Sequence, residues 1–182
     1  MIIENTEKLK AIVNDICNWN AQRYDQKFCA ELTDKLLAEE ASELYSAMQS
    51  KDEVEQVDAL ADIFYIAIGA LWKHKNSQDE ILTTLDIYLN TRDICADLNV
   101  LQGLLMPLTR AAQAAGASLA RLIDKYDERF ALNVISAVCK SNNTKKVEKV
   151  EANVKANLDK GKNYVPPTND IKMYLNNFNK EN

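Results

Sequence analysis

The stretch from residue 57 to residue 72 constrains the fold more than any other, because two aspartates interrupt an otherwise apolar run. Its sequence is VDALADIFYIAIGALW, and Asp58 and Asp62 are its only charged residues. An ionised carboxylate that is isolated in apolar surroundings costs on the order of several kcal/mol. At roughly 100° per residue, a helix places both side chains on one face. The chain must therefore offset two neighbouring negative charges, most simply with a cation.

The composition favours an all-α fold and excludes several classes of function. The chain has 182 residues, of which 47% are hydrophobic, with only 4 glycines and 3 prolines. Helix formers dominate, and alternating patterns of β-branched and aromatic residues are few. A formal net charge of −5 argues against broad nucleic-acid binding. The longest uncharged apolar run, residues 63–72, is far shorter than the roughly 20 residues of a membrane span.

The cysteines indicate a reducing environment. Cys17, Cys29, Cys95 and Cys139 are widely separated, and no Cys-x-x-Cys motif is present. We interpret them as reduced thiols of a cytoplasmic protein. The N-terminal residues lack the basic and apolar segments of a signal peptide, which agrees with this expectation.

Apolar periodicity and capping signals predict a series of helices. Ser50-x-x-Glu53 and Ser77-x-x-Glu80 have the pattern of a capping box, and each is expected to open a helix. With approximate bounds, the expected helices cover residues 5–24, 26–49, 50–75, a helix that opens at 77, 93–115, 118–139 and 147–161.

Several residues should interrupt these helices. Pro107 should kink or break the segment around it, and Gly116 should end that segment. Residues 141–143 (Ser-Asn-Asn) indicate a turn. Residues 164–167 (Tyr-Val-Pro-Pro) must be extended, because proline fixes φ and biases the residue before it away from the helix.

We therefore expect a single all-α domain over residues 1–182, built as a bundle of five to seven helices. Its core helices should lie at about residues 5–75 and 118–160. A helical segment at about 80–116 has no assigned place. Residues 162–182 are expected to form an extended, polar C-terminal tail with room for one short helix.

A second group of carboxylates lies one helix before the two aspartates. Glu40 lies at the edge of that helix's apolar stripe, Glu43 lies just beyond it, and Glu39 points further out. The short connection between the two helices favours an antiparallel pair. Such a pair would bring Glu40 and Glu43 toward the two aspartates.

Converging carboxylates repel one another unless a cation joins them. Hard divalent cations prefer oxygen ligands, and Mg²⁺ (or Mn²⁺) suits carboxylates combined with substrate phosphates. Softer metals are disfavoured, because His74 is the only histidine and the Glu-x-x-His pairs of a di-iron bundle are absent. Two other interpretations stay open. A glutamate run commonly forms a solvated helix face, and the aspartates can instead pair with lysines or cap a helix.

Two segments together resemble a known family. Residues 37–44 (LAEEASEL) and 57–65 (VDALADIFY) resemble the all-α nucleoside triphosphate pyrophosphohydrolases, which include MazG, phosphoribosyl-ATP pyrophosphohydrolase and dimeric dUTPase. The family signature is Glu-x-x-Glu on one helix and Glu-x-x-Asp on the next. Glu40-x-x-Glu43 fits the first half, and Asp62 ends the second. The position three before Asp62 is Ala59, and Asp58, four before, takes the place of the glutamate as in some MazG-like relatives.

A second match lies downstream. Residues 141–145 (SNNTK) resemble the Ser-Asn-x-Ser/Thr-Lys segment of MazG-like proteins, whose asparagine and lysine reach the nucleotide. The resemblance implies a MazG-like four-helix core with additional helices, acting as a homodimer or homotetramer. It implies Mg²⁺-dependent hydrolysis of a nucleotide to the monophosphate and pyrophosphate. The implied metal ligands are Glu40, Glu43, Asp58 and Asp62, the catalytic carboxylates are Glu39 and Glu40, and the substrate-binding residues are Asn142, Lys145, Trp19 and Tyr164.

A different class of function is compatible with the same residues. The chain can be a non-catalytic helical protein that binds a nucleotide or a metal, or that serves as an oligomeric interaction module on the same scaffold. The carboxylates can also serve salt bridges between subunits. Trp19, Tyr65 and Trp72 are more often core residues than base-stacking ones.

Overall fold

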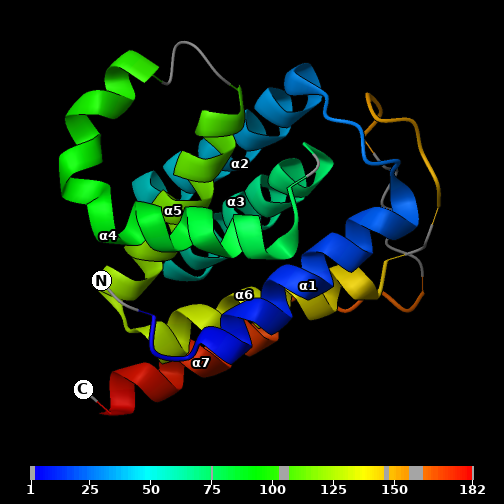
Figure 1. The fold of residues 1–182 in the computed structure, drawn as a ribbon. Helices are drawn as coiled ribbons and strands as arrows, with labels where there is room; N and C mark the ends of the chain where they lie inside the picture. Colours follow the sequence, from blue (N-terminus) through cyan, green and yellow to red (C-terminus); the bar gives the residue numbers. More distant parts are fainter. Residues whose placement is uncertain (1–2, 75, 103–106, 146–147, 156–161, 182) are drawn as a thin grey trace.

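The chain folds into packed helices, as the computed structural model in Figure 1 shows. It describes residues 3–74, 76–102, 107–145, 148–155 and 162–181, and no strand occurs among them. The helices are α1 (Thr6–Arg23), α2 (Ala30–Ser50), α3 (Glu53–Lys73), α4 (Gln78–Gln102), α5 (Pro107–Lys125), α6 (Glu128–Asn143) and α7 (Thr168–Glu181). The predicted all-α bundle is therefore confirmed.

Helix α3 lies at the centre of the bundle. It packs against α2 and α5 and also contacts α1, α4, α6 and α7 (Figure 1). Its sequence explains this position, because apolar residues occur on nearly all of its sides. Phe64 and Ile68 are fully buried, and burial of each such side chain contributes about 1.5–3 kcal/mol. The two aspartates of α3 are therefore held in the most apolar helix of the chain.

Two of the predicted helix starts are confirmed by their caps. The side chain of Asn5 accepts a hydrogen bond from the backbone N–H of Lys8 and caps α1. Ser77 and Glu80 form the predicted capping box before α4. Glu80 N donates to Ser77 Oγ (3.2 Å), and Ser77 N donates to Glu80 Oε2 (2.7 Å).

The capping box predicted at Ser50 is wrong. Ser50 ends α2, and its hydroxyl donates back to the carbonyl oxygen of Ser46 (3.0 Å). Lys51 then adopts the left-handed conformation with φ of 57°, which terminates the helix. Asp52 is the residue that caps α3, accepting from the backbone N–H groups of Val54 and Glu55.

The second helix begins four residues later than predicted, at Ala30. The preceding residues are used for contacts with the far end of α3 instead. Gln26 Nε2 donates to the carbonyl oxygen of Trp72 (2.9 Å), and the ring of Phe28 packs against His74 with centroids 5.4 Å apart.

Pro107 and Gly116 behave differently from each other. Pro107 is the first residue of α5, where its missing N–H costs nothing. Gly116 lies in the middle of α5 and does not end it, contrary to prediction. A Cβ at this glycine would lie 2.1 Å from a ring carbon of Tyr88. The glycine therefore allows α5 to approach α4 closely. Part of the predicted 93–115 helix, residues 103–106, lies outside the described residues.

The predicted 118–139 helix is two helices. Helix α5 ends at Lys125, and Asp127 caps α6 by accepting from the backbone N–H of Phe130. Residues 141–143, predicted as a turn, form the last turn of α6.

The short amphipathic helix predicted over 147–161 is absent from the part of it that the structure describes. Residues 148–155 form turns and irregular backbone. Val150 uses its backbone N–H to bond the carbonyl oxygen of Arg23 (2.8 Å), which explains why this segment is held without helical bonds. Val147, Leu158 and Gly161 lie outside the described residues.

The C-terminal segment is more ordered than the predicted tail. Residues 164–167 are non-helical, as their prolines require, but α7 follows directly. Ile171 and Leu175 of α7 are buried in the core. The ring of Phe178 packs edge-on against Tyr126 with centroids 5.3 Å apart. Helix α7 therefore covers α3 and α6.

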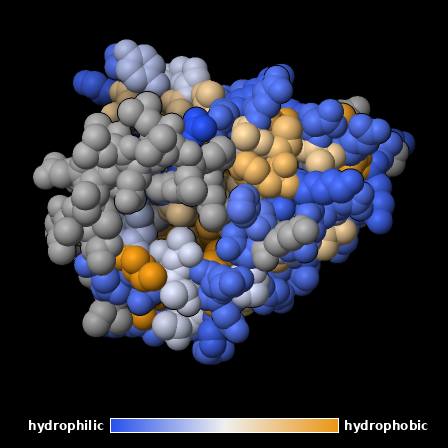
Figure 2. Space-filling view, turned by 45° about the horizontal axis from the view of Figure 1, so that its top comes forward, coloured by the Kyte–Doolittle hydropathy of each residue, from blue (hydrophilic) through white to orange (hydrophobic). Residues whose placement is uncertain are grey.

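Among the coloured residues in the view of Figure 2, groups of apolar residues lie between hydrophilic ones. None of the helices, over the described residues, is long and apolar enough to cross a membrane. Cys17, Cys29 and Cys139 are free thiols, whereas the side chain of Cys95 lies outside those described.

Candidate active site

A cavity of about 860 Å³ runs along α3, which we call the central cavity. From α3, its lining extends from Glu55 to Lys73. One end, the acidic end, is lined by carboxylates, and the other, the apolar end, is lined mainly by aliphatic and aromatic side chains. The residues of the acidic end are Glu40, Glu43, Glu55, Asp58 and Asp62, and those of the apolar end include Tyr24, Cys29, Leu32, Thr33, Leu36, Ile66, Ala70 and Lys73.

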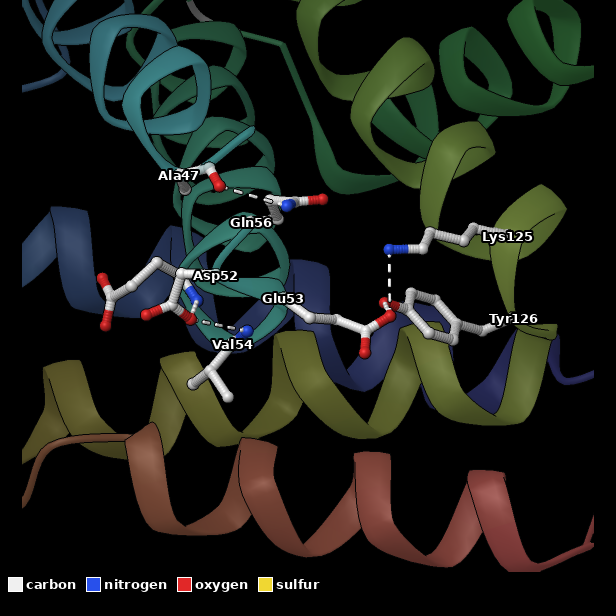
Figure 3. Close-up of polar contacts among 8 residues, drawn as sticks. Ala47, Asp52, Glu53, Val54, Gln56, Lys125 and Tyr126 are labelled. Carbon is white, nitrogen blue, oxygen red and sulfur yellow. Dashed lines mark hydrogen bonds and ion pairs between the residues drawn. The ribbon is translucent and has the colours of Figure 1, made fainter. Parts of the chain in front are cut away.

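The antiparallel pairing of α2 and α3 creates the acidic end. Near the connection between the two helices, Gln56 Nε2 donates to the carbonyl oxygen of Ala47 (3.2 Å, Figure 3). Phe28 contacts His74 near the opposite end of the pair. Glu40 and Glu43 are thereby brought to the same cavity as the two aspartates, as the sequence predicts.

The N-terminus of α3, just before the acidic end, is anchored by other polar groups (Figure 3). Asp52 caps the helix through Val54 N (3.1 Å). Glu53 Oε1 accepts a hydrogen bond from Tyr126 Oη (2.8 Å) and pairs with Lys125 Nζ (3.0 Å). These bonds fix the first turn of α3 against the end of α5, and thus the placement of the carboxylates one turn further on.

Two half-buried carboxylates of the acidic end each have one buried oxygen without a hydrogen-bond partner. Glu40 Oε2 and Asp58 Oδ1 are both inaccessible to solvent and have none within the described residues. Burial raises the pKa of Glu40 to about 7, and the charge of Glu43 adds to this effect. Burial likewise raises the pKa of Asp58 to about 7, and the charge of Asp62 adds to it. An unpaired buried group of this kind costs about 1–3 kcal/mol or more.

The residues of the acidic end fit a hard divalent cation by their chemistry. They supply oxygen donors, and two of these oxygens are buried and unsatisfied, on facing helices. Their side chains are not preassembled around one point. No group of three or more histidine, cysteine or acidic side chains lies close enough for metal ligation within the described part of the chain.

Basic and amide side chains lie beside the carboxylates. Lys145 Nζ donates to Asn142 Oδ1 (2.5 Å), and both residues line the central cavity, as predicted. The positive charge of Lys145 partly opposes the rise in the pKa of Asp58, so the two groups are neighbours. The backbone of Lys145 is held by Arg23, whose Nη2 donates to its carbonyl oxygen (3.1 Å).

Glu39 does not line the central cavity. Its carboxylate accepts a hydrogen bond from Lys155 Nζ, and this bond lowers the pKa of Glu39. Lys155 itself lines the cavity. The carboxylate predicted to act on water is therefore committed to a lysine.

The aromatic residues that the sequence assigned to the base have different places. Trp19 lines the cavity but is a fixed wall, because its Nε1 donates to the carbonyl oxygen of Asn142 (2.9 Å) and its ring meets Tyr65 edge-on. Tyr164 also lines the cavity and is half-buried, with its ring 5.7 Å from Lys145 Nζ.

A side chain of α1 packs directly against Gly69 of α3. A Cβ at Gly69 would lie 2.8 Å from Nδ2 of Asn20, whose amide donates to the carbonyl oxygen of Ile16. The glycine therefore admits a side chain of α1, which closes part of the cavity wall. Both residues line the central cavity.

Sequence reasoning missed three charged residues of the cavity: Glu55, Lys73 and Lys155. Glu55 had a signal, since Glu55-x-x-Asp58 has the Glu-x-x-Asp spacing of the family signature. The two lysines have none in the local sequence, because their places depend on contacts with distant residues.

Comparison with known proteins agrees with this geometry. The family model described as phosphoribosyl-ATP pyrophosphohydrolase matches residues 8–87, which span α1 to α3 and the start of α4. The match therefore contains every carboxylate of the acidic end. No curated protein and no solved structure matches the chain. Residues 8–87 therefore match the phosphoribosyl-ATP pyrophosphohydrolase family, a member of the MazG-like superfamily of nucleoside triphosphate pyrophosphohydrolases.

Proposed function

We propose that this protein is a Mg²⁺-dependent pyrophosphohydrolase that splits a nucleoside triphosphate, or a related nucleotide, into the monophosphate and pyrophosphate. The observation that carries the proposal is the pair of buried, unpartnered carboxylate oxygens of Glu40 and Asp58 in one cavity. The family match over the same helices supports it. The lysines beside these carboxylates suit a polyanionic substrate.

The cation would be held by carboxylates from both helices. The ligands in this proposal are Glu40, Glu43, Asp58 and Asp62, and Mn²⁺ would replace Mg²⁺ in the same oxygen-rich set. When bound, Mg²⁺ supplies charge that neutralises phosphate oxygens and makes water more acidic. Glu55 lines the same end of the cavity and is a fifth carboxylate there.

The protein's own groups position the substrate and take up a proton. Lys145 and Lys155 offset the phosphate charge, and Asn142 holds Lys145 in place. A water oxygen forms a bond to the α-phosphorus, while the bond from that phosphorus to its bridging oxygen breaks and pyrophosphate leaves with the electron pair. Glu40, which lines the same cavity, is the carboxylate that we assign to accept the proton of that water.

Glu39 has an indirect role in this mechanism. Because its carboxylate is bonded to Lys155, we assign it to positioning that ammonium at the cavity. Trp19 and Tyr164 are proposed to contact the base or sugar as cavity walls. The resemblance also implies a homodimer or homotetramer, which sedimentation measures directly.

Product analysis tests the proposal. The purified protein is incubated with a panel of NTPs and dNTPs and Mg²⁺, and the monophosphate and pyrophosphate should appear in equal amounts. Glu40→Gln and Asp62→Asn should lower turnover by about 100-fold or more. Glu31→Gln, an exposed position in the first turn of the same helix as Glu40, should not. Release of orthophosphate instead of pyrophosphate would contradict the reaction.

The alternative class of function gives a different result in the same panel. A non-catalytic nucleotide-binding protein would bind a nucleotide in calorimetry while releasing no product. An interaction module would bind neither nucleotide nor Mg²⁺, and its thermal stability would not change when Mg²⁺ is added.

A further inference from the structure

The apolar end of the central cavity contains one ammonium group, that of Lys73. This lysine is the last residue of α3, and only 9% of its surface is exposed. Its Nζ lies 3.5 Å from the centre of the Tyr24 ring. Within the described residues, the group has no hydrogen-bond or ion-pair partner. Lys73 and Tyr24 both line the cavity.

The surroundings of this ammonium are poor in acceptors. Leu32, Leu36 and Ala70 line the same part of the cavity. The hydroxyl of Thr33 donates to the carbonyl oxygen of Cys29 (2.9 Å), and its oxygen accepts no hydrogen bond from Lys73. Lys73, by contrast, has three N–H donors, and an aromatic face satisfies its charge only in part.

A ligand that fills this end must therefore bring an acceptor. In the empty cavity, water can solvate the ammonium. A ligand that displaces this water without replacing its bonds leaves a buried charge unsatisfied, which is strongly unfavourable. Burial already lowers the pKa of Lys73 to about 8, which agrees with limited solvation.

The separation of the two ends suits a nucleotide. Asp62 and Lys73 are about 16 Å apart along the helix axis, at roughly 1.5 Å per residue. Helical side chains lean toward the N-terminus, which for Lys73 is the direction of the carboxylates. With its phosphates at the acidic end, a nucleotide would direct its base toward Lys73.

We propose that Lys73 determines base specificity by donating a hydrogen bond to a carbonyl oxygen on the edge of the base farthest from the sugar. This inference rests on the proposed function, and it names a substrate class: nucleotides of keto bases, such as uracil, thymine, guanine or hypoxanthine. In an amino base, such as cytosine or adenine, the corresponding group is an N–H donor. It would face the ammonium donor to donor, and neither group would be satisfied.

Matched substrate pairs test this specificity. UTP and CTP differ at position 4 of the pyrimidine, and ITP and ATP differ at position 6 of the purine, in each case as keto against amino. We expect kcat/KM to favour the keto member of each pair by about 10- to 100-fold. Equal values within both pairs for the unmodified protein would overturn the proposal without any variant.

The variant Lys73→Met tests whether the Lys73 ammonium causes the preference for keto bases. Lys73→Met keeps a long unbranched side chain over Tyr24 and removes the donors, so the keto-to-amino ratio should fall toward one. Lys140→Met is the matched control, because Lys140 lies in the last turn of α6, is exposed and does not line the cavity. Thermal unfolding of both variants shows whether they are folded. An unchanged ratio in a folded Lys73→Met would assign the preference to another residue.

The binding arm separates this inference from the proposed function. Calorimetry compares the affinity for UMP with that for CMP, and the affinity for IMP with that for AMP. These binding measurements do not depend on catalytic activity. If nothing is hydrolysed but UMP binds more tightly than CMP in a Lys73-dependent way, the pyrophosphohydrolase proposal fails and the specificity stands. If the nucleotides are hydrolysed but neither pair is discriminated, only the specificity proposal fails. If no nucleotide binds, both are wrong.

Discussion

Two carboxylates of α3, Glu53 in its first turn and Asp58 about one turn further on, lie in opposite environments: the first has hydrogen-bond donors, and one oxygen of the second has none. Glu53 accepts bonds from Tyr126 and Lys125, and the Tyr126 hydroxyl is the main reason that its pKa is lowered. Asp58 has a buried oxygen with no partner, and its pKa is raised to about 7. The first carboxylate is satisfied by the fold alone. The second has one oxygen that the described fold leaves without a partner.

This difference separates structural from functional acidic residues better than sequence spacing does. Both groups lie in the first turns of α3, and both are part of an acidic run in the chain. A carboxylate that the fold supplies with donors contributes to stability. One that the fold buries and leaves unsatisfied lowers stability and is expected to be retained for binding or catalysis.

The largest expected effect is on activity. Glu40→Gln removes a buried carboxylate of the acidic end and should lower kcat/KM by about 100- to 1,000-fold, because it removes a proton acceptor and a cation ligand together. Glu53→Gln should change kcat/KM by less than about threefold, since that carboxylate bonds α5 and lies outside the cavity lining. Steady-state kinetics with the preferred nucleotide compare them. A large loss of kcat/KM in Glu53→Gln would contradict the assignment of Glu53 to structure and of Glu40 to catalysis.

The next effect is the pH dependence of stability without divalent cations. Glu40 and Asp58 keep their protons to about pH 7 in the folded state, but only to about pH 4 when unfolded. Their stabilising contribution is therefore complete below about pH 4 and is lost as the pH rises through about 7. We expect a loss of about 2–4 kcal/mol for the two together, after allowing for partial solvent exposure.

Urea unfolding at a series of pH values measures this loss. The double variant Glu40→Gln/Asp58→Asn should have a flatter profile between about pH 4 and 7, since neither replacement titrates. Addition of Mg²⁺ should restore stability at pH 8 in the unmodified protein and not in the variant. A profile that rises across this range in both proteins would mean that the carboxylates are solvated.

A single substitution at the acidic end should raise stability, by less than the loss expected above. Asp58→Asn removes a half-buried charge whose Oδ1 has no hydrogen-bond partner, so the cation-free protein should become more stable by about 1–2 kcal/mol at pH 8. The same substitution should weaken Mg²⁺ binding, which calorimetry measures. Asp86→Asn is a control on the exposed face of α4, where little change is expected. Destabilisation by Asp58→Asn would indicate that its carboxylate has protein partners in solution.

The acidic end was predictable from the sequence because its geometry is local. Helical spacing places Asp58 and Asp62 on one face, and a short connection allows α2 to lie antiparallel to α3. Glu40 and Glu43 then reach the same cavity. The first half of the signature and the apolar pattern specify these positions without any knowledge of the rest of the chain.

The remaining features depend on contacts that the local sequence does not encode. Glu39 was predicted to act on water, but its bond to Lys155 depends on a residue that is distant in the sequence. The end of α2 was misplaced because Ser50 and Asp52 both have capping chemistry, and only the left-handed backbone at Lys51 decides between them. Gly116 resembled a helix terminator, yet it serves the close approach of α4 and α5.

The smallest expected effect concerns the satisfied carboxylate itself. Tyr126→Phe removes the hydroxyl that donates to Glu53, while the ring still stacks on Phe130 with centroids 4.1 Å apart. Because Glu53 is 44% exposed, water can replace part of the lost bond, and the loss of stability should be about 0.5–1 kcal/mol. Thermal unfolding at pH 7 measures it. The difference between the two proteins should shrink as the pH falls through the lowered pKa of Glu53, because the protonated carboxyl accepts the bond less strongly. A difference that persisted unchanged at low pH would place the effect in the packing of the ring rather than in the carboxylate.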